Sequence, residues 1–263
     1  MAPSAGRSPS SASASDRSNE IDALRRLYER ATSGPTYEPD EADLADVHLA
    51  GLALPLRASI AVFAVTALIL VDQLRWLLPP SGDATTDVLG LRLIPLARFA
   101  LFLVAPLGLV LFVFRDRPAR YGLRLGDWRW GAALLLAGLA VMTPIILWLA
   151  GLASFRAFYG GASVPFGAAL LNNLVELVPA EFLFRGFLMF ALWRRIGPLA
   201  LVVVQVPFVL THLGKPDVEL WSTFIGGSIF AWLDWRTGSI VWSALGHVYV
   251  LTLMTLAVGG ATL

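Results

Sequence analysis

Seven long runs of mostly apolar residues constrain the fold of this chain more than any other feature of its sequence. They cover residues 56–78, 94–114, 130–154, 165–192, 198–213, 219–235 and 239–258. A helix needs about 20 predominantly apolar residues to cross the hydrocarbon core of a bilayer. Only helices and closed barrels cross it, because every backbone polar group must be bonded internally there. The runs therefore predict an all-α polytopic transmembrane helical bundle.

The overall composition of the 263-residue chain supports this class of protein. Hydrophobic residues account for 57% of the chain and charged residues for 15%, whereas an average soluble domain carries about 25% charged residues. The formal net charge of +1 gives no sign of a nucleic-acid partner, so the expected surroundings are the lipid bilayer. The chain has no cysteine, which excludes disulfides, thiol catalysis and thiolate metal ligands.

The part of the chain before the first run, residues 1–52, is predicted to form an N-terminal arm. It begins with a stretch rich in Ser, Ala and Pro, a composition typical of disorder. Ile21, Leu24 and Leu27 then recur at a helical spacing and predict a short amphipathic helix. The arm lacks the apolar core of a cleavable signal peptide. Residues 53–263 are therefore predicted to form the transmembrane domain and to direct its own insertion.

The run at 165–192 decides whether the bundle has seven or eight helices. It contains Pro179, which removes a backbone donor and bends or interrupts a helix. Arginine positions distinguish the two arrangements, because cytoplasmic loops are enriched in Lys and Arg. One kinked helix leaves Arg194 and Arg195 on the same side as the arginine-rich loop 115–129, whereas a pair of helices separates them. The single kinked helix is therefore preferred, with that loop in the cytoplasm.

These features together predict a multi-pass protein of the cell membrane. Arginine and alanine are abundant in the sequence while lysine is scarce. This composition points to a prokaryotic source.

Four ionisable residues lie inside the apolar runs, namely Glu181, Arg185, His212 and His247. A charged side chain at the centre of a bilayer costs about 2.5–3.5 kcal/mol even on the lenient insertion scale, so such residues are rare and usually functional. Glu181 and Arg185 are four positions apart, so they share one face of a helix and can pair. The expected depths of both histidines permit a single site near the middle of the membrane.

These residue types suit hydrolytic chemistry. Two neutral imidazoles from different helices can hold a divalent cation such as Zn²⁺, which makes His212 and His247 the candidate metal ligands. A nearby carboxylate can be a third ligand or the base that deprotonates a water molecule, and an arginine can fix its orientation. In the alternative interpretation, Glu181 and Arg185 form a structural clamp and the histidines are hydrogen bonders in helix packing.

The motifs around these residues resemble those of the CPBP or Abi family (CAAX proteases and bacteriocin-processing proteins), whose founding members are CAAX-prenyl endopeptidases. The family pattern is Glu-Glu-x-x-x-Arg, then Phe-x-x-x-His, then His-x-x-x-Asn/Asp. In this chain the similar residues are, in the same order, Glu181 with Arg185, Phe208 with His212, and His247. The resemblance covers residues 165–258.

The resemblance implies an intramembrane metal-dependent endopeptidase, a hydrolase that cleaves a peptide bond of a membrane protein or membrane-associated peptide. It assigns all four ionisable residues to the catalytic site. Glu181 would be the base or a metal ligand, and Arg185 would orient it. His212 and His247 would bind the metal or stabilise the oxyanion.

The sequence departs from the family pattern at two positions. Ala180 stands where the family has its first Glu, the carboxylate usually assigned to activating water, and Leu251 stands where the last motif has Asn or Asp. The sequence HLGKPDVE resembles a family variant in which Lys-Pro-x-x-Glu follows the histidine, which makes Glu219 a candidate for the missing carboxylate. The role of Glu176, on a different helix face from Glu181, stays open. The alternative function is a catalytically inactive family member that acts as a membrane binding or scaffold protein.

Overall fold

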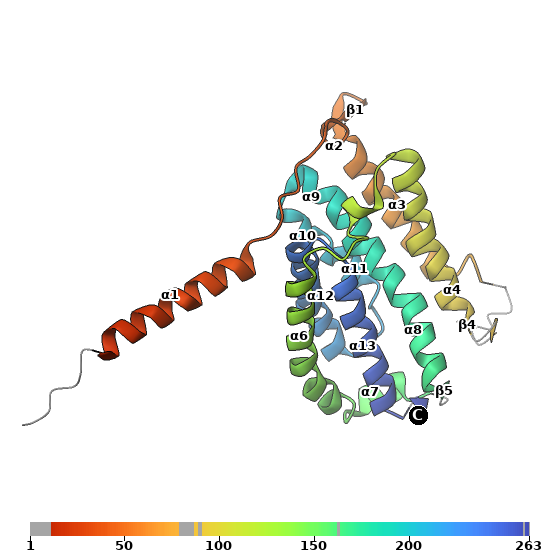
Figure 1. Cartoon of the computed structure of the whole chain (residues 1–263). Helices are drawn as coiled ribbons and strands as arrows, with labels where there is room; N and C mark the ends of the chain where they lie inside the picture. Colours follow the sequence, from red (N-terminus) through yellow and green to blue (C-terminus); the bar gives the residue numbers. More distant parts are fainter. Residues whose placement is uncertain (1–11, 79–86, 89–90, 162–163, 260, 263) are drawn as a thin grey trace, which may run out of the picture. The chain divides into compact units, whose positions relative to one another are not determined.

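The computed structural model of this protein describes residues 12–78, 87–88, 91–161, 164–259 and 261–262 (Figure 1). It divides into two compact units, and the division falls after Gly34. Residues 35–52, which the sequence assigned to the N-terminal arm, belong to the same unit as the helical bundle.

The first unit contains α1 (Ala12–Thr32), in which Ile21, Leu24 and Leu27 are all exposed. The helix begins earlier than the apolar spacing predicts and includes part of the stretch expected to be disordered. Alanine and arginine, which have high helix propensity, are interspersed with the serines there. The rest of that stretch, residues 1–11, lies outside the described residues.

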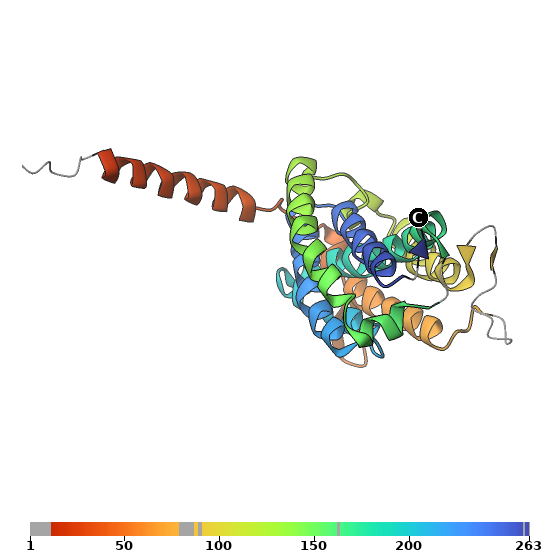
Figure 2. The ribbon, with the colours of Figure 1, turned by 90° about the horizontal axis from the view of Figure 1, so that it is seen from below.

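Each of the seven apolar runs forms a helix in the second unit. The bundle consists of α3 (Leu56–Gln73); α4 (Leu93–Phe99) with η1 (Ala100–Val104), α5 (Ala105–Gly108) and η2 (Leu109–Val113); α6 (Trp128–Leu149); α8 (Phe166–Glu181) with η4 (Phe182–Met189) and α9 (Phe190–Ile196); α10 (Leu199–Val203) and α11 (Gln205–Leu210); α12 (Asp217–Thr237); and α13 (Val241–Ala257). The segments η1, η2 and η4 are π-helical. Helix α13 packs against both α6 and α8 (Figure 2).

The remaining elements are short connections. They are α2 (Glu41–Leu44), the 3₁₀ turn η3 (Pro118–Tyr121), α7 (Ala153–Tyr159), and the strands β1 (Asp46–Leu49), β2 (Leu52–Pro55), β3 (Asp87–Val88), β4 (Leu91–Arg92), β5 (Val164–Pro165) and β6 (Ala261–Thr262). The pairs β1–β2 and β3–β4 are antiparallel and β5–β6 is parallel. These strands lie outside the bundle helices, so the fold is all-α.

The outer helices have the length and composition of membrane spans. Among the described residues, α3, the stack from α4 to η2, and α6 are long and apolar enough to cross a membrane, and most of their residues are not buried by the protein. Apolar side chains that face outward suit a hydrocarbon environment rather than water. The predicted all-α membrane bundle is thus confirmed.

The helix that carries Glu181 and Arg185 lies at the centre of the bundle. The chain stays helical from Phe166 to Ile196, and it widens into π-helical turns just after Pro179, where a backbone donor is missing. Every residue of η4 is buried. A side chain at Gly186 would come within 2.8 Å of the Tyr121 carbonyl oxygen, so only glycine permits this close packing. One continuous helical segment, rather than a pair of helices, therefore supports the site, as the arginine positions favoured.

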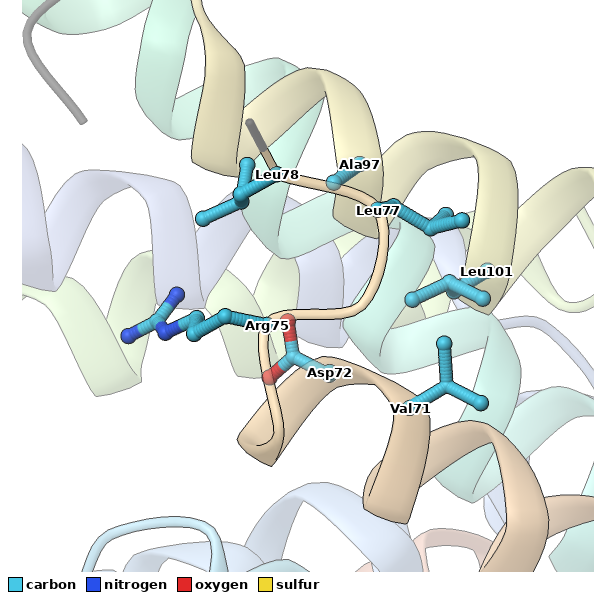
Figure 3. A pocket seen from close by; sticks show the side chains of 7 residues that line it. All are labelled: Val71, Asp72, Arg75, Leu77, Leu78, Ala97 and Leu101. Atoms are coloured by element: carbon cyan, nitrogen blue, oxygen red, sulfur yellow. The ribbon is translucent and has the colours of Figure 1, made fainter. Parts of the chain in front are cut away.

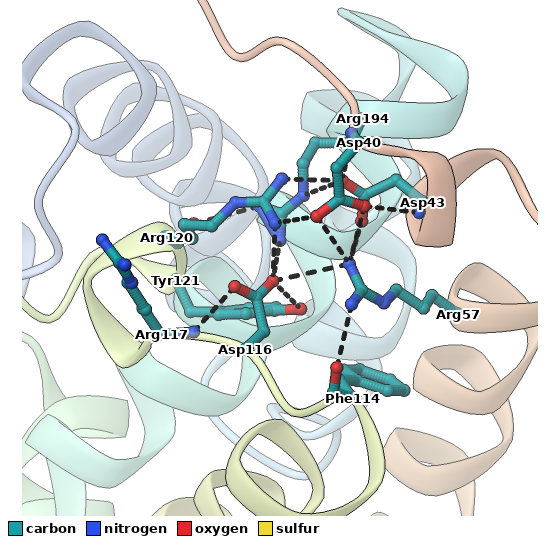
Figure 4. A network of polar contacts seen from close by, with 9 residues as sticks. All are labelled: Asp40, Asp43, Arg57, Phe114, Asp116, Arg117, Arg120, Tyr121 and Arg194. Carbon is teal, nitrogen blue, oxygen red and sulfur yellow. Dashed lines mark hydrogen bonds and ion pairs between the residues drawn. The ribbon is translucent and has the colours of Figure 1, made fainter.

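A network of charged side chains joins the segment before α3 to the end of the bundle (Figure 4). Asp43 lies at its centre, with its carboxylate 2.8 Å from Arg57 Nη1, 2.7 Å from Arg120 Nη2 and 3.2 Å from Arg194 Nε. Asp116 contacts the same three arginines, and Asp40 contacts Arg57 and Arg120. The network therefore pairs three carboxylates with three guanidinium groups.

Candidate active site

Glu181 forms hydrogen bonds with two of the other three predicted site residues. Glu181, the last residue of α8, accepts a 2.5 Å hydrogen bond from Arg185 Nη1 on its Oε2 atom. Its Oε1 atom lies 2.6 Å from His247 Nδ1, which α13 supplies from 66 positions further along the chain. Glu181 and Arg185 are fully buried, whereas His247 is partly accessible. Both oxygens of Glu181 are thus committed to partners.

His212 reaches the same site through Phe208 rather than through a hydrogen bond to Glu181. The Phe208 ring lies 4.8 Å from the His212 ring and 6.2 Å from the His247 ring, measured between centroids. The guanidinium carbon of Arg185 sits 4.0 Å above the same phenyl ring, an arrangement that favours cation–π attraction. His212, His247 and Arg185 therefore surround the ring of Phe208, and Glu181 joins this group through its bonds to Arg185 and His247.

The hydrogen bonds of the two imidazoles fix which ring nitrogen is free. His212 Nδ1 lies 2.9 Å from the Phe208 carbonyl oxygen, which can only accept, so Nδ1 carries the proton. His247 Nδ1 likewise donates to the Glu181 carboxylate. In the neutral imidazoles Nε2 therefore keeps its lone pair, which is available to a proton, a water molecule or a metal ion.

The donor set for a metal ion is incomplete. Among the described residues, no group of three or more His, Asp or Glu side chains is placed to hold an ion together. Catalytic zinc sites usually have three protein ligands. His212 and His247 could supply two, but both oxygens of Glu181 are engaged by Arg185 and His247.

A second polar cluster follows His212 in the chain. The sequence pointed to Glu219 as one of its members but not to Tyr159. Glu219, in the first turn of α12, accepts hydrogen bonds on Oε1 from Lys215 Nζ at 2.8 Å and from the Tyr159 hydroxyl at 2.5 Å. Its Oε2 atom is buried and has no hydrogen-bond partner among the described residues. Burial and the Glu219 carboxylate raise the pKa of Tyr159, so the phenol stays protonated and donates.

Glu176 takes part in a third cluster, on the side of α8 that faces α3 and α4. Its carboxylate contacts Arg98 Nη1, and Arg98 Nη2 lies 3.1 Å from Asp72 Oδ2. A cavity beside Asp72 has a volume of only about 10 Å³, roughly the space of one water molecule (Figure 3). This cluster therefore joins three helices and offers no room for a substrate.

Asp234 is a fully buried carboxylate whose depth could not be read from the sequence. It accepts a 2.8 Å hydrogen bond from Ser243 Oγ, one helical turn before His247 on α13, while its Oδ1 atom has no partner among the described residues. Asp234 is near the end of the apolar run 219–235, a position at which a polar side chain would ordinarily meet the membrane surface.

The fold and the site together define a polytopic helical membrane protein with a buried Glu–Arg–His centre. Residues 162–252 match the family described as Rce1-like, type II CAAX prenyl endopeptidase Rce1-like. This match confirms the resemblance to CAAX proteases, and the matched region contains all four predicted site residues. Comparisons with curated proteins and with solved structures gave no match.

Proposed function

We propose that this protein is an intramembrane endopeptidase that hydrolyses a peptide bond of a membrane protein or membrane-associated peptide. The observation that carries the proposal is the buried Glu181–Arg185–His247 arrangement, which lies within the region that matches the CAAX endopeptidase family. A buried charge pair alone is compatible with a structural clamp. Two adjacent imidazoles with free Nε2 atoms add groups that can transfer protons or bind an oxyanion.

Each residue has a distinct part in the proposed site. Arg185 neutralises Glu181 and fixes its orientation, and Glu181 in turn holds His247 Nδ1 so that Nε2 faces away from it. His212, held by the Phe208 carbonyl oxygen, offers its Nε2 lone pair to a water molecule. His247, when protonated on Nε2, can donate to the carbonyl oxygen of the scissile bond as negative charge develops there.

A divalent cation such as Zn²⁺ remains part of the proposal, with His212 and His247 as its ligands. The described residues do not complete a three-ligand set, so no step of the mechanism is assigned to the ion. The lipid bilayer of the cell membrane is the expected environment, and the substrate reaches the site from within it.

The alternative function is an inactive family member that binds a membrane partner. Two observations favour it, namely Ala180 in place of the expected first carboxylate and the commitment of both Glu181 oxygens to other groups. In that case Glu181, Arg185 and His247 would only join helices.

A cleavage assay on purified protein in detergent separates the two functions. A library of membrane-embedded peptides is incubated with the unaltered protein, with Glu181→Gln, and with Glu38→Gln as a control at an exposed glutamate. The endopeptidase proposal predicts products from the unaltered protein and the control but not from Glu181→Gln. Identical products from all three would remove Glu181 from the chemistry, and an absence of products from the unaltered protein would favour the inactive alternative.

A further inference from the structure

The two glutamates near the site differ in the hydrogen-bonding capacity that they keep free. Both Glu181 oxygens are bonded, one to Arg185 and one to His247, and the side chain is fully buried. Glu219 uses only Oε1 for its two donors, while Oε2 is buried without a partner among the described residues. A buried acceptor without a donor costs about 1–3 kcal/mol, so such atoms usually mark a bound water, a ligand or a catalytic role.

The position of Glu219 is fixed by three separate elements. Tyr159 comes from the end of α7, Lys215 from the turn that follows α11, and Glu219 from the start of α12. Lys215 is the only lysine in the chain, and its ammonium group lies 2.8 Å from Glu219 Oε1. A cation and a phenol on one oxygen hold the carboxylate so that the other oxygen points to a constant position.

The same turn connects this carboxylate to His212. The backbone N–H of Lys215 donates a 3.1 Å hydrogen bond to the carbonyl oxygen of His212, so the two residues close one tight turn. His212 presents an unprotonated Nε2 atom, as its Nδ1–H bond to Phe208 requires. One tight turn thus links His212 to Lys215, and the ammonium group of Lys215 contacts Glu219.

We infer that Glu219 is the general base of the endopeptidase proposed above, on which this inference rests, because one of its carboxylate oxygens has no donor among the described residues whereas both oxygens of Glu181 already accept one. Glu219 Oε2 removes one proton from a water molecule whose other hydrogen is held by His212 Nε2. The water oxygen bonds to the carbonyl carbon of the scissile peptide, and the π electron pair moves to the carbonyl oxygen.

The second half of the reaction returns the proton. The tetrahedral species re-forms its C=O bond as the C–N bond breaks, and the Glu219 carboxylic acid gives its proton to the leaving nitrogen. The products are a new carboxyl terminus, which contains the water oxygen, and a new amino terminus. Glu219 ends the cycle as a carboxylate, so no further reactant is needed.

Glu219→Gln is the direct test, with Asp217→Asn as its matched control in the same first turn of α12. The glutamine keeps an acceptor oxygen for Tyr159 and Lys215 but cannot take a proton. Cleavage should fall by about 100-fold or more, the typical contribution of general base catalysis, while Asp217→Asn cleaves at the unaltered rate. Ala180→Glu introduced into Glu219→Gln should restore part of the activity, because it places a carboxylate beside Glu181.

A pH profile of the Lys215→Met variant keeps the inference testable if Glu219→Gln does not fold. Removal of the neighbouring cation makes the base easier to protonate, so the acid limb of the cleavage profile should move to higher pH. A role in folding alone would lower the amount of active protein without moving that limb.

The possible outcomes separate the inference from the proposed function. Cleavage by the unaltered protein and by Glu219→Gln at equal rates, with none by Glu181→Gln, would overturn the role of Glu219 and leave the endopeptidase proposal standing. An unmoved acid limb in Lys215→Met would overturn it as well. No cleavage by the unaltered protein would contradict both the role of Glu219 and the endopeptidase proposal.

Discussion

Two clusters of buried charge in this protein are built in opposite ways. The network at the end of the bundle pairs three carboxylates with three arginines, and Asp43 and Asp116 each contact all three guanidinium groups (Figure 4). In the central site, Arg185 is the cation bonded to Glu181. His212 and His247, in their neutral form, each keep an unprotonated Nε2 atom. Next to that site, Glu219 and Asp234 each keep a buried carboxylate oxygen without a partner among the described residues. The atoms of the end network that lack a hydrogen bond to a described residue, Nε and Nη2 of Arg194, lie 3.2 Å and 3.9 Å from carboxylate oxygens of Asp43 and Asp116.

The difference between these clusters indicates which of them has a chemical task. A charge network with balanced partners is stable by itself and needs no ligand. Buried acceptor oxygens without a donor reduce stability, and a protein retains them where they meet a substrate, a water molecule or an ion. The end network is therefore interpreted as structural and the central site as reactive, and the following experiments challenge that distinction.

The largest effect is expected from Arg185→Met. It leaves the fully buried Glu181 without its cation, and breaking a buried pair in this way typically costs about 3–5 kcal/mol. Denaturant unfolding in detergent should show this loss together with a loss of cleavage. The double variant Arg185→Met with Glu181→Gln should regain stability but not activity, and a fully stable single variant would contradict the buried pair.

Asp43→Asn should separate stability from activity. It removes one charge from the centre of the end network, where the side chain is 2% exposed, and should lower the free energy of unfolding by roughly 2 kcal/mol. The cleavage rate per folded molecule should stay unchanged, because the network lies apart from the histidines. A specific activity that falls in parallel with Glu181→Gln would show that the two clusters are coupled.

Metal content tests whether the free imidazole nitrogens bind an ion. Protein purified with and without Zn²⁺ is compared with the double variant His212→Ala with His247→Ala. The proposal predicts that only the unaltered protein retains an ion through dialysis. Equal, negligible metal in both proteins would count against the cation while leaving the roles of the histidines in proton transfer intact.

The smallest effect concerns the pH dependence of the end network. Burial by itself would raise the pKa of Asp40, but the hydrogen bond from the Asp43 N–H and the guanidinium groups of Arg120 and Arg57 outweigh it and hold the pKa well below its usual range. A carboxylate with a lowered pKa stabilises the fold above its unfolded pKa of about 3.9, and this stabilisation is lost as the pH falls toward the folded pKa.

The unfolding temperature of the protein should therefore decline below about pH 4, where unfolded aspartate begins to take up protons. Asp40→Asn should show a flatter decline, because the substituted side chain does not titrate. Equal slopes for both proteins would mean that Asp40 contributes nothing to the network.

Local features of the site were predictable from the sequence, whereas long-range contacts were not. The spacing of Glu181 and Arg185 fixes their pairing, since positions four apart share a helix face, and apolar runs such as 239–258 mark helices such as α13 (Val241–Ala257) to within a few residues. The sequence was compatible with a bond between Glu181 and His247 but did not predict it, because the bond depends on how two distant helices cross.

Other contacts lay beyond the sequence for the same reason. Glu176 is bonded to Arg98, 78 positions away. Glu219 is bonded to Tyr159, 60 positions away. The π-helical turns of η4 leave no mark in hydropathy, because they change the number of residues per turn and not the residue types. Motif spacing therefore predicted the candidate site residues, and the packing of the helices determined which of their atoms are hydrogen-bonded.

The most direct test of the central claim is the fate of water oxygen during cleavage. The unaltered protein and His212→Ala are incubated with a membrane-embedded peptide in H₂¹⁸O, and the masses of the products are measured by mass spectrometry. A hydrolytic site predicts new carboxyl termini that carry ¹⁸O in the unaltered protein and no product in His212→Ala. The same labelled products from His212→Ala, or no product from the unaltered protein, would contradict the assignment of hydrolysis to this site.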